Sequence, residues 1–252
     1  MKKTTIVIVA ILLVLAMGQV VMASKGDATG GIILGYDYKT RLSGGSGFNT
    51  NTTNSFMAGI SGNYYVMEKF SISAKTLFTI GEYSFTAGGG GTGKSAIISI
   101  NVFGKYDIYV TDMFIIGAKL GGSYEHYNLL LENEYMGYGE ARIFNSFFVS
   151  PGVYASVNVS PKINIYGDFV FPVFTTIIDV EDSKSTYTGV FNYFLYDITL
   201  GAAYAVSPNI TLGIEGNFYN ASSYKLESEY SLSGGKGYKV EFNAGLKIGY
   251  KF

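Results

Sequence analysis

The sequence predicts an all-β protein that crosses a membrane as a closed, antiparallel up-and-down barrel of about ten strands. The last eleven residues, Phe242 to Phe252, place an apolar residue at every even position and a small or polar residue at every odd one. Such alternation indicates a strand with one face in an apolar medium and the other in a polar one. Hydrophobic residues make up 48% of the chain, yet after Ser24 no apolar run is long enough for a transmembrane helix. Only a closed sheet then allows the chain to span a membrane.

Ten segments of the chain alternate in this way, and an even number suits a single-chain barrel. Each segment carries only a weak signal, so eight or twelve strands remain open as alternatives. Pro151 lies within the sixth segment and indicates a bulge there. In chain order the expected strands are Gly30–Tyr38, Ser55–Tyr65, Phe70–Tyr83, Ala96–Tyr106, Phe114–Tyr124, Ile143–Val157, Ile163–Phe174, Phe191–Val206, Ile210–Tyr219 and Tyr238–Phe252.

Turn residues justify the boundaries of these strands in order. Brief connections follow the second, fourth, sixth and eighth strands: Met67-Glu68-Lys69, Val110-Thr111-Asp112, Ser160-Pro161-Lys162 and Ser207-Pro208-Asn209. Proline suits such turns because it fixes the backbone and has no amide hydrogen to donate to a ladder. Longer connections, rich in Gly, Ser, Thr and Asn, follow the other strands and are expected on the external side: Arg41–Asn54, Thr86–Lys94, Tyr127–Arg142, Thr175–Thr188 and Ala221–Gly237.

The amino terminus resembles a cleaved secretory signal, which predicts that residues 1–23 are removed and residues 24–252 form one barrel domain. Lys2 and Lys3 precede an apolar run that ends at Met22, and Ala23 supplies the small residue before a cut at Ser24. The alternative is a membrane anchor, since the run approaches the length that spans a bilayer. The chain has no cysteine, which excludes disulfides, thiolate metal sites and lipid attachment to a cysteine.

Alternation also predicts which way the strand side chains point. Even positions of the second to fifth, ninth and tenth strands are expected to face lipid: Phe56, Ala58, Ile60, Ile72, Phe78, Ile98, Ile100, Val102, Ile116, Leu120, Ile210, Leu212, Ile214, Leu246 and Ile248. The charged side chains expected in the lumen are Asp37, Lys75, Lys105, Lys119, Glu125, Asp168, Asp197, Glu215, Lys239, Glu241 and Lys247. Their near balance of sign favours paired ions that fill a narrow interior, and the alternative is a conducting channel.

The carboxyl terminus resembles that of bacterial outer-membrane barrels, whose last strand commonly ends in phenylalanine and is recognised by the assembly machinery. Tyr250 and Phe252 are the residues that carry this resemblance. It implies a location in the outer membrane of a Gram-negative-type bacterium, with outer-membrane lipid, lipopolysaccharide and the barrel assembly machinery as partners. The external loops are the expected place for any extracellular ligand.

In its ten-strand plan the chain resembles the omptin family of surface proteases, most closely at Tyr83-Ser84-Phe85-Thr86-Ala87 and in the closing hairpin from Tyr204 to Phe252. Omptins activate a water molecule with an aspartate pair and an Asp-His pair. The corresponding fourth loop here, Ile178 to Ser183, has carboxylates but no histidine, and no early strand offers an aspartate pair. The only histidine, His126, follows Glu125 directly, so on a strand the two side chains point to opposite faces. The sequence therefore predicts no catalytic residues and no enzyme activity.

Two further patterns point to weak sites at most. Asp179, Glu181 and Asp182 are a candidate cluster for a hard cation such as calcium, although a solvated acidic loop has the same composition. The glycine-rich run from Gly88 to Ser95 lacks the strand and helix that a phosphate-binding loop needs. No cofactor is expected. A net charge of −1 does not indicate the basic surface that binding to nucleic acid requires.

These observations predict a non-enzymatic surface protein that acts through its exterior loops in a structural or adhesive role. A narrow porin-like channel for small solutes or ions is the first alternative. An omptin-like surface protease with a rearranged site is the second.

Overall fold

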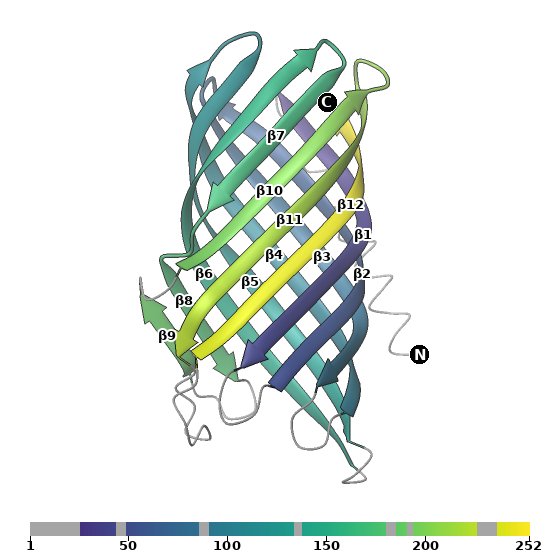
Figure 1. Cartoon of the computed structure of the whole chain (residues 1–252). Helices are drawn as coiled ribbons and strands as arrows, with labels where there is room; N and C mark the ends of the chain where they lie inside the picture. Colours follow the sequence, from purple (N-terminus) through teal and green to yellow (C-terminus); the bar gives the residue numbers. More distant parts are fainter. Residues whose placement is uncertain are drawn as a thin grey trace.

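The computed structural model describes residues 26–43, 49–85, 91–133, 138–179, 185–190, 194–225 and 236–252, which form a twisted cylinder of tilted strands (Figure 1). No helix among these residues is long and apolar enough to cross a membrane. The strands are β1 (Ala28–Ser43), β2 (Asn49–Met67), β3 (Phe70–Phe85), β4 (Gly91–Val110), β5 (Phe114–Asn133), β6 (Tyr138–Ser160), β7 (Ile163–Val170), β8 (Phe174–Asp179), β9 (Ser185–Val190), β10 (Phe194–Ala205), β11 (Ile210–Lys225) and β12 (Lys236–Lys251).

The predicted closed antiparallel barrel of ten strands is confirmed. Around the wall the order is β1, β2, β3, β4, β5, β6, β7, β10, β11 and β12, and β12 pairs with β1 to close the ring. In the closing ladder Asp37 faces Asn243, and Lys39 faces Glu241. The remaining two strands, β8 and β9, form a hairpin that continues the sheet from β6.

The expected seventh strand, Ile163–Phe174, is interrupted, because β7 ends at Val170 and β8 begins at Phe174. Pro172 lies in the gap and has no amide hydrogen to donate to a ladder. On either side of it, Phe171 N donates to Pro151 O at 3.1 Å and Val173 N donates to Val149 O at 2.8 Å. The expected eighth strand, Phe191–Val206, corresponds to β10, and residues 191–193 at its start lie outside the described residues. Most of β8 and of β9 falls in the expected connection Thr175–Thr188, so that prediction of an irregular loop was wrong for the described part of this segment.

The bulge expected at Pro151 is not found in the ladder between β5 and β6, where Leu120 faces Pro151 without a shift of register. The irregularity lies instead in the ladder on the other edge of β6, where β6 pairs with β7 and then with β8. Gly152 pairs with Val170 of β7, and Val149 pairs with Phe174 of β8. Between these two pairs there are three residue steps along β6 but four along the chain from β7 to β8. The extra residue belongs to the segment that contains Pro172.

Several strands run well past their expected loop-side ends. β1 continues to Ser43, β5 continues to Asn133, and β6 begins at Tyr138, so most of the expected loop 127–142 is a β-hairpin. In these extensions the alternation of apolar and polar residues is weak, because both faces of a strand outside the membrane can meet water. The hydrogen-bonded ladder nevertheless continues.

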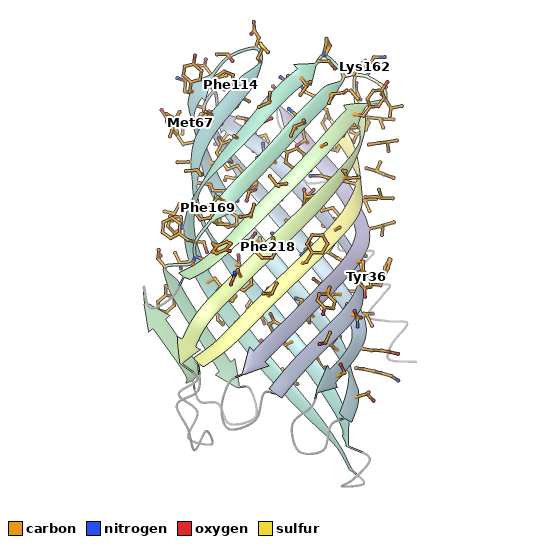
Figure 2. The ribbon with its side chains drawn as sticks, viewed as in Figure 1. Tyr36, Met67, Phe114, Lys162, Phe169 and Phe218 are labelled. Carbon is orange, nitrogen blue, oxygen red and sulfur yellow. The ribbon has the colours of Figure 1, made fainter. Side chains whose placement is uncertain are left out.

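The side chains expected to face lipid lie on the outer surface, where exposed apolar residues include Leu246, Ile214, Leu120 and Phe56. Aromatic residues form one band around the middle of the barrel, marked by Tyr36, Phe169 and Phe218, and another near the short turns, marked by Phe114 (Figure 2). In the middle band the ring of Tyr196 stacks against that of Phe169, with the ring centres 6.1 Å apart, and it lies tilted against the ring of Phe218, with the centres 6.2 Å apart. Aromatic belts mark membrane interfaces, so the apolar wall between the bands is the membrane-spanning part.

Candidate functional site in the barrel interior

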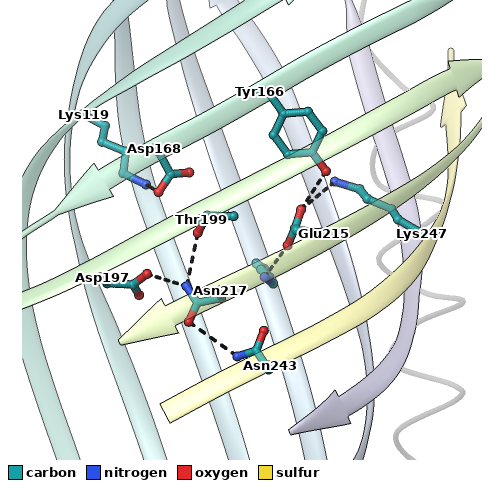
Figure 3. A network of polar contacts seen from close by, with 10 residues as sticks. Lys119, Tyr166, Asp168, Asp197, Thr199, Glu215, Asn217, Asn243 and Lys247 are labelled. Carbon is teal, nitrogen blue, oxygen red and sulfur yellow. Dashed lines mark hydrogen bonds and ion pairs between the residues drawn. The ribbon is translucent and has the colours of Figure 1, made fainter. Parts of the chain in front are cut away.

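The interior contains a basic layer, defined here as Lys75, Lys105, Lys119 and Lys247, together with the carboxylates of Glu215 and Asp168. Figure 3 labels Lys119, Lys247 and both carboxylates. Glu215 on β11 is the centre of the basic layer. Its Oε1 lies 2.5 Å from Lys75 Nζ on β3, and its Oε2 lies 3.6 Å from Lys247 Nζ on β12. The hydroxyl of Tyr166 on β7 also donates to Oε2 at 2.9 Å. Four strands thus meet at one carboxylate.

Lys119 and Lys105 form the other side of this layer. Lys119 Nζ lies 2.6 Å from Asp168 Oδ1 and 4.5 Å from the centre of the Phe103 ring. Lys105 Nζ lies 5.2 Å from the centre of the Tyr154 ring. The tyrosine rings reach into the lumen because Gly117 and Gly201, which face Tyr154 and Tyr166 in the ladders, have no Cβ to obstruct them.

On the side of the basic layer that faces the loop end, amide side chains hold the carboxylate of Asp197. Asn217 Nδ2 donates to Asp197 Oδ1 and to Thr199 Oγ1, the latter at 3.2 Å. Asn243 Nδ2 in turn donates to Asn217 Oδ1 at 3.5 Å (Figure 3). These contacts link β10, β11 and β12 across the inner face.

An acidic layer, defined as Asp37, Glu125 and Glu241, lies nearer the loop end. Lys39 Nζ is 2.7 Å from Glu241 Oε1 and 3.5 Å from Asp37 Oδ2, and it lies 5.7 Å from the centre of the Tyr127 ring on the far wall. Glu125 accepts hydrogen bonds from the hydroxyls of Tyr127 and Ser99, the latter at 3.1 Å. Asp37 and Lys39 are buried.

Among the described side chains, two charged interior residues, Asp107 and Lys39, were not predicted, because the expected strands ended one residue before each of them. Asp107 is buried near the short turns and accepts hydrogen bonds from the hydroxyls of Tyr65 and Tyr154, the former at 3.3 Å. The parity of the alternation, continued by one residue beyond Tyr106 and Tyr38, would have placed both side chains on the inner face.

A cavity of about 500 Å³ occupies the interior around the basic layer. Its described lining includes all four lysines of that layer, and it reaches the rim at the short-turn end through Thr29, Pro208 and Lys251. The lining is rich in hydroxyl, amide and charged groups, which makes it suitable for water and polar solutes.

The other predicted site residues have different outcomes. Lys239 lies in β12 and Asp179 in β8, but their side chains are outside the described residues, as are Glu181 and Asp182. The calcium site therefore stays a prediction, and so does the signal peptide at residues 1–23. In the part of the chain that the structure describes, no group of three His, Cys, Asp or Glu residues could hold a metal ion.

His126 lies on the outer face of β5, where its Nδ1 is 2.9 Å from Asn145 Oδ1 on β6. Glu125 lies on the inner face, so the two adjacent residues point to opposite sides of the wall as expected. At the carboxyl terminus Phe252 N donates to Ala28 O at 3.0 Å, and the rings of Tyr250 and Phe252 pack edge to face at 4.8 Å. Both aromatic side chains are exposed on the outside.

Comparison with known proteins supports the fold and no more specific role. No protein-family model and no curated protein matches the chain. Among solved structures, the outer membrane protease OmpT from Escherichia coli is similar over 91% of this chain and 99% of its own length, with a TM-score of 0.61 and 13% identity. This chain has the fold of a bacterial outer-membrane β-barrel. The transport unit of the autotransporter AIDA-I from Escherichia coli is also similar, over 91% of this chain and 92% of its own, with a TM-score of 0.51 and 12% identity.

Proposed function

We propose that this outer-membrane β-barrel is a non-conducting scaffold, which presents its external segments at the cell surface in a structural or adhesive role. The observation that carries the proposal is the ion pair between Lys75 and Glu215, which joins β3 to β11 across the interior. Three strands, β2, β1 and β12, separate these two around the wall. A ten-stranded barrel is only slightly wider than the eight-stranded size that side chains fill, so one such bridge obstructs much of the passage.

A second bridge at another level supports the same conclusion. Lys39 on β1 lies over the ring of Tyr127 on β5, and Lys39 is also paired with Glu241. An ion or solute that moved along the axis would meet charged contacts at both levels. Separating buried ion pairs leaves uncompensated charge, which is strongly unfavourable.

The described side chains offer little support for a protease with a rearranged site. His126 is turned to the outer face and contacts Asn145. A general base needs a carboxylate to orient it and access to the reacting water. In the described part of the chain the nearest candidate in sequence, Glu125, is on the opposite side of the wall and is hydrogen-bonded by Ser99 and Tyr127.

The decisive test is conductance of the purified protein in a planar bilayer, with a general porin as the positive control. We expect insertion without stable openings. Steady openings in the unaltered protein would overturn the scaffold proposal and support the channel alternative, which the cavity at the short-turn end favours. Ion selectivity that reversed in the variant Lys75→Glu, Lys119→Glu, Lys247→Glu would then assign the basic layer as its filter.

The adhesive role has its own experiment. Bacteria that display the unaltered protein are compared with bacteria in which residues 226–235, between β11 and β12, are replaced by a short Gly-Ser turn. The matched control shortens nothing and carries Lys162→Gln at an exposed short turn on the opposite end of the barrel. We expect attachment to epithelial monolayers to fall only when the external segment is replaced. Equal attachment in all three strains, matched for surface amount, would argue for a structural role.

A further inference from the structure

Lys105 on β4 and Lys119 on β5 lie directly opposite one another in the antiparallel ladder, and both side chains point into the lumen. Directly opposed like charges destabilise a pair of strands. Their side chains diverge, because Lys119 reaches Asp168 and lies over Phe103 while Lys105 lies over the ring of Tyr154. The arrangement keeps two cations at one register position of the inner wall.

The carboxylates of this layer are already engaged by other lysines. Glu215 forms ion pairs with both Lys75 and Lys247, and Asp168 forms one with Lys119. Among the described residues, Lys105 makes no ion pair, and its ammonium group lies over the aromatic face of Tyr154. A face of this kind attracts a cation but does not neutralise it. The basic layer thus holds four lysines against two carboxylates.

Two further described carboxylates, Asp107 and Asp197, lie on either side of this layer, and neither makes an ion pair with one of its lysines. Asp197 accepts a hydrogen bond from Asn217. Asp107, two residues from Lys105 along β4, is held by the hydroxyls of Tyr65 and Tyr154. Glu125 and Glu241 lie six residues from Lys119 and Lys247 along β5 and β12, which is about 20 Å at the usual rise of a strand. The acidic and basic layers are therefore separated along the barrel axis.

The four lysines line the cavity of about 500 Å³ that reaches the short-turn rim, and they share it with Glu215 and Asp168 and, farther toward the loops, with Asp197, Glu125 and Glu241. Asn101 and Asn164 also line it and add neutral hydrogen-bonding groups beside the lysines. An ammonium group offers up to three donors and no acceptor. The natural complement of several such groups in a polar cavity is an anion with several acceptor oxygens.

We propose that the basic layer binds a small oxyanion, taken up from the short-turn side, at Lys105 between Lys119 and Lys247. The ligand class is inorganic phosphate or a small solute that carries a phosphate or carboxylate group. Binding would neutralise the opposed lysines without breaking the ion pairs of Glu215 and Asp168. The site is independent of the scaffold proposal, since a cavity open at one end can be occupied whether or not the barrel conducts.

The test is calorimetric titration of the full, detergent-solubilised protein with inorganic phosphate, and with acetate as the carboxylate arm. Both titrations are run against sodium chloride at equal ionic strength. We expect saturable binding of phosphate or acetate in excess of chloride, and the tighter of the two identifies the ligand group. Lys105→Gln should weaken that binding at least about tenfold, as expected for losing a charge-assisted hydrogen bond. Lys105→Arg should retain it, and Lys162→Gln, on an exposed turn, should match the unaltered protein.

Stability gives a second readout that does not depend on heats of binding. The saturating oxyanion should raise the thermal midpoint of the unaltered protein relative to chloride, because a ligand that binds only the folded state stabilises it. It should leave Lys105→Gln unmoved, and heat-modifiable migration on gels verifies that this variant is folded. No effect beyond chloride in the unaltered protein, or an equal effect in Lys105→Gln, would overturn the proposal.

Discussion

Lys75 on β3 and Glu215 on β11 meet across the interior of the barrel, with Nζ and Oε1 2.5 Å apart. The two residues are 140 positions apart in the sequence. Glu215 also accepts a hydrogen bond from the hydroxyl of Tyr166 and pairs with Lys247, so among the described residues it has three partners, whereas Lys75 has one ion-pair partner. This asymmetry makes the pair a test of how the interior is stabilised.

We expect Glu215→Gln to destabilise the barrel more than Lys75→Gln. The first change leaves two lysines without their carboxylate, at a cost of about 3 kcal/mol in the free energy of unfolding. The second leaves Glu215 paired with Lys247 and bonded to Tyr166, so we expect a loss of about 1 kcal/mol. Urea-induced unfolding in lipid vesicles measures both values. The reverse order would show that Lys75 and not Glu215 is the centre of the network.

Gly117 should resist substitution because a Cβ there would collide with the ring of Tyr154. We expect Gly117→Ala to cost about 1–3 kcal/mol in unfolding free energy, the usual range for overpacking. Gly216→Ala is the matched control, since the nearest atom to a Cβ at Gly216 is Asn243 O at 3.6 Å. Adding Tyr154→Leu to Gly117→Ala should recover part of the loss. A Gly117→Ala protein as stable as the control would contradict the close packing of the ring on the glycine.

The position of the membrane along the wall can be tested with arginine at two depths. Leu246 lies between the two aromatic bands, whereas Ile210 lies at the start of β11 beside a short turn. We expect Leu246→Arg to cost about 2–4 kcal/mol and Ile210→Arg about 0–1 kcal/mol, because the cost of a lipid-facing charge falls toward the interface. Unfolding free energies in vesicles decide the matter, and similar costs at the two positions would place the membrane elsewhere on the wall.

The terminal phenylalanine should matter more for assembly than for stability. Phe252 makes a backbone hydrogen bond to Ala28, and its ring is on the outside against Tyr250. A change of Phe252 to alanine keeps the backbone bond, so the refolded barrel should lose no more than about 1 kcal/mol. The amount of heat-modifiable protein in the outer membrane should fall severalfold. Tyr204→Ala, at another exposed aromatic near the short turns, is the comparison, and an equal fall there would remove the special role of the last residue.

The membrane part of the barrel was predictable because alternation is a local property of the chain. Leu246 and Lys247 are neighbours in sequence, and their opposite faces follow from the period of a strand alone. The same reasoning failed at Pro172, which has no amide hydrogen for a ladder, because the expected seventh strand ends early, at Val170, and a separate strand, β8, begins at Phe174. It also ended two expected strands at Tyr38 and Tyr106, one residue too early to include the interior charges Lys39 and Asp107.

The sequence by itself determined that this chain closes into a barrel, which face of most strands meets lipid, and that most of the interior charges point inward. Only the tertiary structure decided that Lys75 reaches Glu215, that Lys119 reaches Asp168, and that Lys105 is left facing Lys119. The reason is geometric. Alternation is set by each strand alone, whereas contacts across the lumen depend on the tilt and stagger of all the strands when the ring closes.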